Sequence, residues 1–580
     1  MLVTEAGGRL ALRFDYDAPA PHMPGLKLRE EVRRRFPGIR WSRPHGAWIL
    51  PSIDNWDDIL ASYSPEVHPA ARTLVEGIRS TFIPVKPTAA PPPDARFRMS
   101  PPPFTKQVEA INFCLEQEAK GVMHNALLMD KGTGKTRTLV DLCCLLRSRG
   151  QLSRLILFCP PGLQGNEAQE WGIHAWEREM GREAPEWAAT ILEGDGGRRL
   201  AAVARAAAAP PDTLQVLILN YEATRNALLV EALIAFAAGA PSMVACDEST
   251  CIKNPAAVQS KAVVRIGKVA ARRTIMTGSL IAEKPVDAFG QYLFLDDTVF
   301  GTSFVAFRAR YCVMGGFESR EVTGFRNMDG FRERLWSRAF RCTKAECLDL
   351  PPKVGGIMNP AGPLVRSFRM PPAMAAAHRA MAERMLVEVE GRRFEAPIVL
   401  TKMLRLQEIT SGYVADGAAV RRLPGPNPKA ELLRQELAES SDMKVIVWCR
   451  EREEAYIIRE AAKACGIDFF ALGGATPDKH AEVEAFKAHP RRAVMAAQVR
   501  TGGMGFTITE ATLAVYFSNP LSLTDREQSE DRCHRAGQSR SVTYVDLVAE
   551  GSIDVWVLAL LRGKAAASAD LMREELRRWK

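Results

Sequence analysis

A glycine-rich loop between an apolar run and a helical pattern constrains the fold of this chain more than any other feature. Residues 126–129 are apolar and predict a strand, the loop Asp130-Lys131-Gly132-Thr133-Gly134-Lys135-Thr136 follows, and residues 135–149 have helical spacing. Further strand-like runs, separated by helical patterns, lie at 154–160, 214–219, 243–246 and 273–277. Strands that alternate with helices form a parallel sheet covered on both faces. We therefore predict an α/β lobe over residues 104–300.

The loop has the residue types that hold a phosphate chain. Backbone N–H groups from Gly132 to Thr136 can surround phosphate oxygens, and the start of the next helix adds a favourable dipole. Lys135 would reach the β- and γ-phosphates of ATP, and the Thr136 hydroxyl would bind Mg²⁺. The strict pattern has a glycine where Met129 stands. A chance match is the alternative, but the strand before the loop and the helix after it favour ATP binding.

Two carboxylates follow the strand-like run 243–246. Asp247 is placed to hold Mg²⁺, usually through water, because Mg²⁺ keeps much of its hydration. Glu248 is placed to orient or deprotonate an attacking water. An Asp-Glu pair at a strand end is common by chance, and it becomes informative because a phosphate loop precedes it.

Two weaker candidates complete this lobe. Thr277 and Gly278 end the next strand, where a short hydroxyl side chain and a glycine can link the nucleotide state to a neighbouring lobe or to nucleic acid; a simple turn is the alternative. Gln107 lies ahead of the loop, and its amide matches the donor and acceptor edge of adenine. Gln107 alone is weak evidence.

The second half of the chain repeats the α/β pattern without a phosphate loop of its own. Strand-like runs lie at 444–449, 468–472, 493–497, 512–517 and 542–548. After the third of these runs come Thr501, Gly502 and Gly503, where glycines allow a ligand or a sugar-phosphate to approach the backbone closely. A plain glycine turn is the alternative. These patterns predict a second parallel-sheet lobe over residues 369–580.

Arg532 and Arg535 are three residues apart, so on a helix they would share one face, with Gln528 a turn earlier. Two guanidinium groups suit a cluster of phosphate oxygens, because each offers a planar set of donors that stays charged. For an isolated pair, surface salt bridges would be the preferred interpretation. With a phosphate loop upstream, we predict that both arginines face Lys135 across bound ATP. We assign His534 a structural role.

The first 82 residues form a small separate module in our prediction. Residues 26–36 have helical spacing, and residues 39–50 predict a hairpin around Pro44 and Gly46. Basic and aromatic side chains gather there, as a nucleic-acid strand requires. The candidate DNA contacts are Arg33, Arg40, Trp41 and Arg43. The alternative is that the tryptophans form the core of the module.

Prolines dominate residues 83–103, which we predict to be an extended linker. Residues 290–345 are rich in aromatic and arginine residues, and residues 301–368 predict a helical insertion or linker, either as an ordinary amphipathic element or, by the family resemblance described below, with a phosphate-contacting face.

Composition agrees with an ordinary intracellular globular protein. The chain has 580 residues, 47% of them apolar, and a net charge of +9, which permits a polyanionic partner without requiring one. Its 12 cysteines include no C-x-x-C pair, and no run of about 18 apolar residues or signal-peptide pattern occurs. We expect a cytoplasmic monomer with reduced thiols and no membrane contact; no protein partner is predicted.

The motifs resemble those of a known family. Gln107 and the stretches MDKGTGKT, LILFCPPGL, LNYEAT, DESTCIKN and MTGSLIAEKPVDAFG occur in the order and spacing of SWI/SNF-like, helicase-related ATPases of superfamily two. This resemblance implies two RecA-like parallel-sheet α/β lobes with helical insertions, plus the small α+β N-terminal domain, and a motor that moves along double-stranded DNA by hydrolysing ATP. DEST and TGSL depart from the usual family motifs, and the missing proline in TGSL leaves the loop after Gly278 less defined.

The second lobe resembles the same family. The stretch QVRTGGMGFTITEATLAVYFSNP is similar to the fifth motif, which implies that Thr501 and Gly502 touch DNA and Gly503 senses nucleotide. The stretch QSEDRCHRAGQSRSVTYVDLVAEGSID resembles the sixth motif, which implies that Arg532 and Arg535 are arginine fingers supported by Gln528 and Gln538. In the module, PGIRWSRPHGAWILP is similar to the HARP-type domain that engages branched DNA.

Three functions are compatible with these residues. The first is a DNA-stimulated ATPase that moves on double-stranded DNA, with forked DNA as a candidate substrate for annealing or remodelling. The second is a helicase of superfamily two that unwinds RNA or DNA. The third is a DNA-binding scaffold without ATPase activity, against which the presence of all six expected catalytic residues argues. They are Lys135, Thr136, Asp247, Glu248, Arg532 and Arg535.

Overall fold

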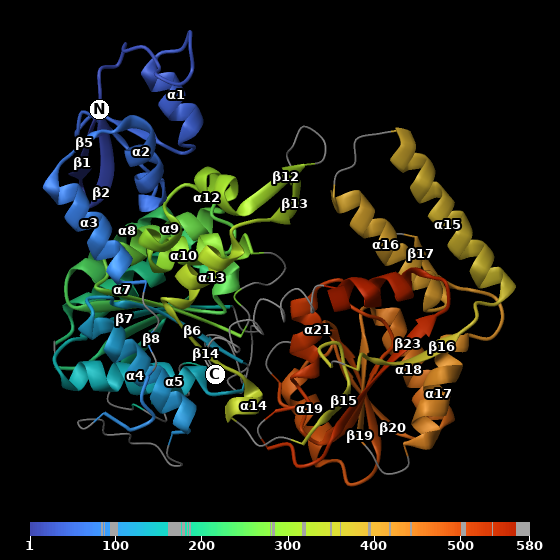
Figure 1. Cartoon of the computed structure of the whole chain (residues 1–580). Coiled ribbons are helices and arrows are strands. Elements are labelled where there is room, and N and C mark those ends of the chain that lie inside the picture. Colours follow the sequence, from blue (N-terminus) through green and yellow to red (C-terminus); the bar gives the residue numbers. More distant parts are fainter. Residues whose placement is uncertain are drawn as a thin grey trace. The chain divides into compact units, whose positions relative to one another are not determined.

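The protein, represented by a computed structural model (Figure 1), folds into two compact units, Met1–Pro161 with Trp176–Cys347, and Gly162–Ala175 with Leu348–Lys580. The structure describes residues 1–82, 85, 87–92, 103–130, 132–160, 176, 180–181, 184, 187–210, 212–278, 280, 285–315, 321–347, 351–359, 361–391, 396–416, 419–440, 444–499, 506–535 and 537–563. The two units are described one at a time.

The N-terminal module of the first unit is a five-stranded sheet with three helices. Its strands are β1 (Leu2–Ala6), β2 (Arg9–Arg13), β3 (Arg40–Ser42), β4 (Ala47–Ile49) and β5 (Glu66–Val67), in the order β3-β4-β2-β1-β5. Its helices are α1 (Leu28–Arg35), α2 (Trp56–Tyr63) and α3 (Pro69–Ser80). The predicted hairpin is confirmed, with Trp41 opposite Trp48 across β3 and β4. Trp48 is buried in the core whereas Trp41 is 49% exposed.

Seven parallel strands form the central sheet of the first unit, in the order β14-β6-β11-β10-β7-β9-β8. They are β6 (His124–Met129), β7 (Arg154–Cys159), β8 (Ala188–Ile191), β9 (Gln215–Asn220), β10 (Ser242–Asp247), β11 (Arg272–Thr277) and β14 (Ala339–Cys342). The strands inside the sheet are almost continuously apolar because helices bury both faces. The strands that we predicted in this lobe are confirmed to within about two residues at their ends.

The helices that cover this sheet are α4 (Thr105–Ala119), α5 (Lys135–Ser148), α7 (Gly196–Ala208), α8 (Ala227–Ala238), α9 (Val258–Gly267), α10 (Asp287–Leu295) and α11 (Asp297–Phe300), with short 3-10 turns η2 (Tyr221–Arg225) and η3 (Ser249–Ile252). In Figure 1, α4 and α5 lie on one side of the sheet and α8, α9 and α10 on the other. Ahead of α4, residues 87–92 run along that helix, where the Asn112 amide donates hydrogen bonds to the carbonyl oxygens of Thr88 and Ala90.

The aromatic insertion contains α12 (Phe304–Tyr311), β12 (Cys312–Gly315), β13 (Glu321–Phe325), α13 (Met328–Trp336) and α14 (Lys344–Cys347). Three of its rings are core residues that pack together with Phe300 of α11. Phe300 stacks on Phe331 at 5.0 Å between ring centroids, and Phe307 contacts Tyr311 at 5.1 Å. All four side chains are at most 4% exposed. A phosphate-contacting face of residues 301–368 stays a prediction.

The second unit contains another parallel sheet, in the order β15-β23-β22-β19-β21-β20, with β16 also paired to β23. Its strands are β15 (Lys353–Gly355), β16 (Leu364–Phe368), β19 (Lys444–Cys449), β20 (Asp468–Leu472), β21 (Ala493–Gln498), β22 (Ala511–Tyr516) and β23 (Val542–Ala549). The other elements are α15 (Pro372–Gly391), α16 (Ala396–Thr410), β17 (Tyr413–Asp416), β18 (Ala419–Arg422), α17 (Pro428–Glu439), α18 (Arg452–Ala464), α19 (Lys479–Ala488) and α21 (Leu523–Glu530). Two parallel-sheet lobes and a small α+β module therefore confirm the predicted fold class.

One sequence expectation about cysteine is wrong. We expected reduced thiols throughout, but Cys342 at the end of β14 and Cys347 in α14 form a disulfide. The turn at α14 brings together two cysteines that no C-x-x-C pattern marks. In the part of the chain that the structure describes, no helix is both long and apolar enough to cross a bilayer.

Candidate nucleotide site

The phosphate loop joins β6 to α5 through two glycines in the left-handed region. Gly132 has φ +82° and Gly134 has φ +88°, values that side chains other than glycine rarely adopt. The Thr133 hydroxyl donates a hydrogen bond of 2.7 Å to the carbonyl oxygen of Asp130, which closes the turn. Lys131, a predicted ATP contact, lies outside the described residues.

Gln107 braces this loop from α4. Its Nε2 donates to the carbonyl oxygen of Thr133 at 3.0 Å, and its Oε1 accepts from the backbone N–H of Phe104 at 3.0 Å. The side chain is only 2% exposed. In this structure both ends of the amide are therefore bonded to the protein's own backbone. Recognition of adenine by Gln107 stays a prediction.

The loop can accept a phosphate chain. Lys135 is the first residue of α5, and its ammonium donates to the carbonyl oxygen of Met129 at 2.8 Å, so it is held at the edge of the loop. Thr136 follows it in the first turn of the helix, partly buried. The left-handed glycines, the helix start and the ammonium are the donor set that triphosphate oxygens require.

The acidic pair stands at the carboxyl end of β10. Asp247 Oδ2 accepts from the indole Nε1–H of Trp176 at 2.9 Å, and Oδ1 accepts from the backbone N–H of Glu248 at 3.0 Å. Burial and the charge of Glu248 raise the pKa of Asp247 to about 6, whereas the positive charge of Lys135 opposes the shift. The positive charge of Lys135 therefore acts on the Asp247 carboxylate. The parallel sheet places the phosphate loop and the acidic pair at the same edge, at the carboxyl ends of β6 and β10.

Glu248 adopts φ +48°, one of the few positive values among the non-glycine residues that the structure describes. This conformation costs on the order of 1–3 kcal/mol and persists only where the surroundings impose it. The different roles of the two residues, Asp247 at Mg²⁺ and Glu248 at water, stay predictions.

Sequence reasoning missed two residues that support this pair. Trp176 holds Asp247, and Gln291 of α10 links two neighbouring segments: its Oε1 accepts from the Ser249 hydroxyl at 2.6 Å, and its Nε2 donates to the carbonyl oxygen of Leu280 at 2.7 Å. Gln291 is fully buried. No local pattern marks either residue, because each acts through a contact far away in the sequence.

Thr277 and Gly278 lie beside this linkage. Thr277 ends β11 and is 1% exposed, and Gly278 follows it, half-buried. Burial of Thr277 places it next to the nucleotide region of the sheet. Direct contact of either residue with DNA stays a prediction.

In the second unit, the two candidate arginines lie on a turn. We expected one helix face, but α21 ends at Glu530, and residues 531–535 form a turn. Arg532 Nε donates to the carbonyl oxygen of Gln528 at 3.0 Å, and Arg535 Nη1 donates to the Thr507 hydroxyl at 2.8 Å. The prediction that Arg532 and Arg535 share one face of a helix is therefore wrong. That both arginines face Lys135 across bound ATP stays a prediction.

The residues around these arginines are structural. His534 is 9% exposed and its Nε2 lies 2.7 Å from the carbonyl oxygen of Pro351, in agreement with the structural role that we predicted. Gln538 Nε2 donates to the carbonyl oxygens of Thr509 and Cys533 at 2.7 and 3.1 Å. The Gln528 backbone supports Arg532. The predicted glycine-motif residues Thr501, Gly502 and Gly503 lie outside the described residues.

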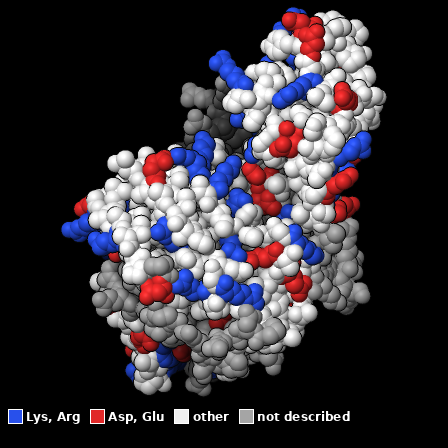
Figure 2. Space-filling view, turned by 90° about the vertical axis from the view of Figure 1, so that its left-hand side faces the viewer, with Lys and Arg blue, Asp and Glu red and all other residues white. Residues whose placement is uncertain are grey.

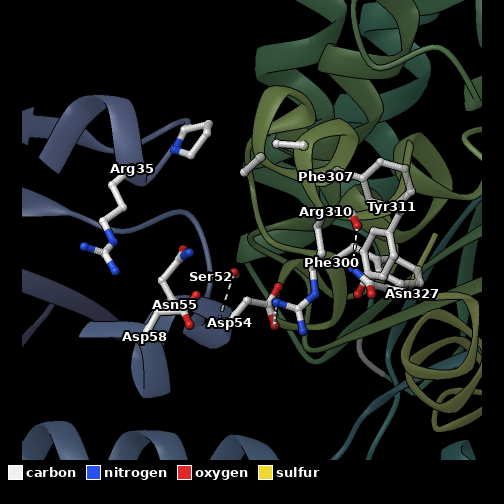
Figure 3. A pocket seen from close by; sticks show the side chains of 13 residues that line it. Arg35, Ser52, Asp54, Asn55, Asp58, Phe300, Phe307, Arg310, Tyr311 and Asn327 are labelled. Atoms are coloured by element: carbon white, nitrogen blue, oxygen red, sulfur yellow. Dashed lines mark hydrogen bonds and ion pairs between the residues drawn. The ribbon is translucent and has the colours of Figure 1, made fainter. Parts of the chain in front are cut away.

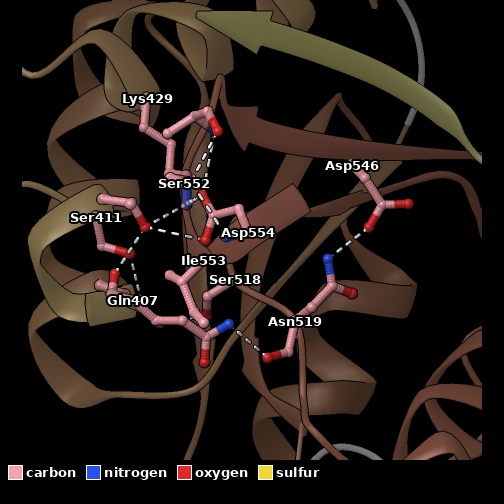
Figure 4. Close-up of polar contacts among 12 residues, drawn as sticks. Gln407, Ser411, Lys429, Ser518, Asn519, Asp546, Ser552, Ile553 and Asp554 are labelled. Atoms are coloured by element: carbon pink, nitrogen blue, oxygen red, sulfur yellow. Dashed lines mark hydrogen bonds and ion pairs between the residues drawn. The ribbon is translucent and has the colours of Figure 1, made fainter. Parts of the chain in front are cut away.

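A buried charge network fixes α21 below this turn. Arg526 is fully buried and donates two hydrogen bonds to the Asp546 carboxylate, at 2.6 and 3.0 Å, and one to Glu530 Oε1 at 3.0 Å. The carboxylates around Arg526, chiefly Asp546, hold its pKa above the usual value despite desolvation. Asn519 joins Asp546 to Gln407 of α16, as Figure 4 shows. The network holds the side chain of Glu530, the last residue of α21 before the arginine turn.

We expect Gly134→Ala to lower ATP affinity at least about tenfold, because its Cβ would lie 2.0 Å from Gln107 Nε2 and the brace on the loop would have to move. The backbone strain adds about 1–2 kcal/mol. Gly121→Ala is the matched control, with φ +78° and open space around the new Cβ. The Gly121→Ala variant should have a lower free energy of unfolding because of the backbone strain, and it should bind ATP like the parent protein. Isothermal titration would disprove the brace if both variants bound ATP like the parent protein.

Two parallel-sheet lobes, a phosphate loop followed by an Asp-Glu pair, and an arginine motif define a class of protein. Residues 428–537 match the family model described as Helicase conserved C-terminal domain. The chain is therefore similar to helicase C-terminal domains over those residues, and over longer stretches to SWI/SNF-related, helicase-related relatives.

Two curated relatives show how far the sequence similarity extends. The DNA annealing helicase and endonuclease ZRANB3 of Mus musculus is 24% identical over 343 residues, which cover 57% of this chain and 30% of that protein. A Caenorhabditis elegans homolog of the SWI/SNF-related matrix-associated actin-dependent regulator of chromatin subfamily A-like protein 1 is 24% identical over 569 residues, 94% of this chain and 74% of the relative. The match therefore spans less than a third of the length of the mouse relative.

A solved structure, the Sulfolobus solfataricus SWI2/SNF2 ATPase core in complex with double-stranded DNA, is 18% identical and covers 83% of this chain and 97% of its own, with a TM-score of 0.37.

Proposed function

We propose that this chain is a DNA-stimulated ATPase that moves along double-stranded DNA. One observation carries the proposal: the phosphate loop after β6 and the acidic pair after β10 meet at the carboxyl ends of one parallel sheet, where the charge of Lys135 acts on Asp247. Ligands of parallel α/β sheets bind at that edge. The matches to DNA-acting relatives support DNA as the partner.

Each residue has one task in this proposal. Lys135 and the loop N–H groups bind and orient the triphosphate, and Thr136 and Asp247 would hold Mg²⁺. When bound, Mg²⁺ neutralises charge that develops on the phosphate oxygens. Glu248 orients the attacking water and accepts its proton.

Arg532 and Arg535 supply positive charge to the γ-phosphate when DNA favours closure of the lobes. Guanidinium groups suit this task because they offer several donors and do not lose their proton. Hydrolysis would then depend on DNA, and each cycle of closing and opening would shift the grip on the DNA backbone. Binding should be independent of sequence, because the candidate contacts are to phosphates.

The N-terminal module supplies a second DNA contact in this proposal. Trp41 is 49% exposed beside exposed Arg40 and Arg43, and its ring lies 5.6 Å from that of buried Trp48. Arg33 lies over the Trp48 ring at 5.6 Å. An exposed ring braced by a buried one is a stacking platform for an unpaired base, which a forked DNA offers. The HARP-like role of residues 1–82 is part of this proposal.

Charges of both signs lie on the face shown in Figure 2, where Lys and Arg side chains are interspersed with Asp and Glu. Among the residues that the structure describes, this face therefore presents no broad positive area to DNA.

ATPase assays with matched single-stranded, duplex, forked DNA and RNA test the proposal. We expect duplex or forked DNA to raise the rate at least about tenfold, and Trp41→Ala to weaken the response to forks by about 5–100-fold in concentration, the loss of one stacked base. Trp556→Ala is the control, with the same 49% exposure in the second unit. Stimulation by RNA alone would favour an RNA helicase, and no stimulation by any ligand would contradict the motor.

A further inference from the structure

The N-terminal module is docked on the first lobe through a buried arginine. Arg338 is 1% exposed and donates to the Thr81 carbonyl oxygen and hydroxyl, each at 2.7 Å, at the end of α3. Its Nε also donates to Asp296 Oδ2 at 2.8 Å. All three guanidinium nitrogens of this buried arginine donate to protein acceptors, so it cannot leave its partners without exposing an uncompensated charge. The contact therefore holds the module against the lobe.

Other contacts hold the same seam. Asp54 of the module forms ion pairs with Arg334 and Arg310. Gly301 approaches the module so closely that an added Cβ would lie 2.7 Å from the Pro51 carbonyl oxygen. A pocket of 310 Å³ lies beside these contacts, and Figure 3 shows the Asp54 carboxylate next to the Arg310 guanidinium in its lining. The pocket marks the boundary between the module and the lobe.

A single strand runs from this seam to the phosphate loop. Arg338 immediately precedes β14, and its carbonyl oxygen accepts from the Ala126 N–H at 2.7 Å. From there β14 pairs with β6 along its whole length, ending with Cys342 opposite Met129. Five residues in extended form span about 13–17 Å. Both ends of β14 are therefore attached, one to the module and one to the loop.

At the loop end, Asp130 is held from two sides. Its backbone N–H donates to the Cys342 carbonyl oxygen at 2.9 Å, and its Oδ2 accepts from the Lys344 backbone N–H at 3.0 Å. The carboxylate thus anchors the segment that follows β14. The part of Asp130 in ATP binding, as a residue of the phosphate loop, stays a prediction beside this contact.

We propose that β14 is a mechanical link through which the N-terminal module and the phosphate loop act on each other, with Arg338 and Asp130 as the positioning residues at its ends. Any ligand that tightens one end would then stabilise the other, and the coupling must be equal in both directions. Only the regulatory role of the link rests on the proposed function: a DNA fork bound by the module would change the affinity for ATP through β14.

Amide hydrogen exchange in the full chain, without nucleotide or DNA, tests the link. Asp130→Ala removes the acceptor of the Lys344 N–H, so we expect amides at residues 76–82 of the module to exchange about 5-fold faster or more. Asp130→Asn keeps an acceptor oxygen and should exchange like the parent protein. In the other direction, Thr81→Val should speed exchange at residues 339–347 and weaken ATP binding by a similar factor. The control is Ser80→Ala.

Ser80 is matched because its hydroxyl, like that of Thr81, donates to a carbonyl oxygen of α3 three residues back, at 2.8 and 2.7 Å, whereas the Arg338 guanidinium donates to the Thr81 hydroxyl. The link would be overturned if Thr81→Val and Ser80→Ala had equal effects. It would also be overturned if the amides at residues 76–82 exchanged at the parent rate in Asp130→Ala. The ATPase assay is independent. A protein with the exchange effects and no DNA-stimulated activity keeps the link and loses the motor, and the reverse result keeps the motor and loses the link.

Discussion

Arg532→Ala lowers the rate of DNA-stimulated ATP hydrolysis by about 10³–10⁵-fold in our expectation, the contribution of an arginine that stabilises charge at the transferred phosphate. ATP affinity should change far less, because the loop at Lys135 binds the nucleotide in its ground state. Arg532→Lys should recover only part of the rate, since an ammonium keeps the charge and loses the planar set of donors. Single-turnover kinetics with a separate ATP titration would measure both quantities.

Arg540→Ala is the matched control. Arg540 lies in the same segment and is exposed, and it donates to the carbonyl oxygen of Glu510. Its variant should keep the parent rate. Because Arg532 also bonds to Gln528 and Phe506, the melting temperature of the Arg532→Ala variant must be measured beside its rate. A folded variant with near-normal turnover would remove Arg532 from the catalytic machinery.

Arg526→Met lowers the free energy of unfolding of the second unit by about 3–5 kcal/mol in our expectation, because it leaves Asp546 and Glu530 as buried carboxylates without their shared partner. Asp546 is fully buried and Glu530 is 1% exposed, so water cannot compensate them in the folded state. Chemical denaturation, followed by the fluorescence of Trp448 in this unit, would measure the loss.

Asp468→Ala provides the comparison for an exposed pair. Its carboxylate lies 2.9 Å from Arg491, whose side chain is 75% exposed, so its removal should cost only about 0–1 kcal/mol. A double variant, Arg526→Met with Asp546→Leu, should recover part of the stability lost in the single variant, since it removes the Asp546 charge as well while Glu530 keeps its ion pair with Lys353. Equal losses in Arg526→Met and Asp468→Ala would contradict a desolvated network below the arginine turn.

Most of the nucleotide loop was predictable because its signals are local. Gly132 and Gly134 must be glycines at positive φ, Lys135 must open the helix, and the strand before them must be apolar to lie inside a parallel sheet. The strand ending at Asp247 follows the same logic. These patterns occur within about ten residues, where backbone preference and burial act directly on the sequence.

The arginine motif shows where local reasoning stops. Spacing alone suggested a helix through Arg532 and Arg535, but α21 ends at Glu530. Tyr544 donates to the carbonyl oxygen of Glu530 at 2.7 Å, and Gln538 takes up carbonyl oxygens of the turn. Those partners come from another strand and loop, and the spacing of two arginines could indicate neither of them. The local spacing therefore did not show where the helix ends.

The sequence alone determined the two parallel-sheet lobes, the position of the phosphate loop and the acidic pair, and the likeness to SWI/SNF-like proteins, because periodicity, glycine positions and short motifs are properties of neighbouring residues. Only the tertiary structure decided that Trp176 holds Asp247, that Gln291 joins Ser249 to Leu280, and that Arg338 fixes the module to the lobe beside β14. The physical reason is that burial and hydrogen bonding depend on partners far away in the chain, and a single indole, amide or guanidinium leaves no pattern until folding supplies its partner.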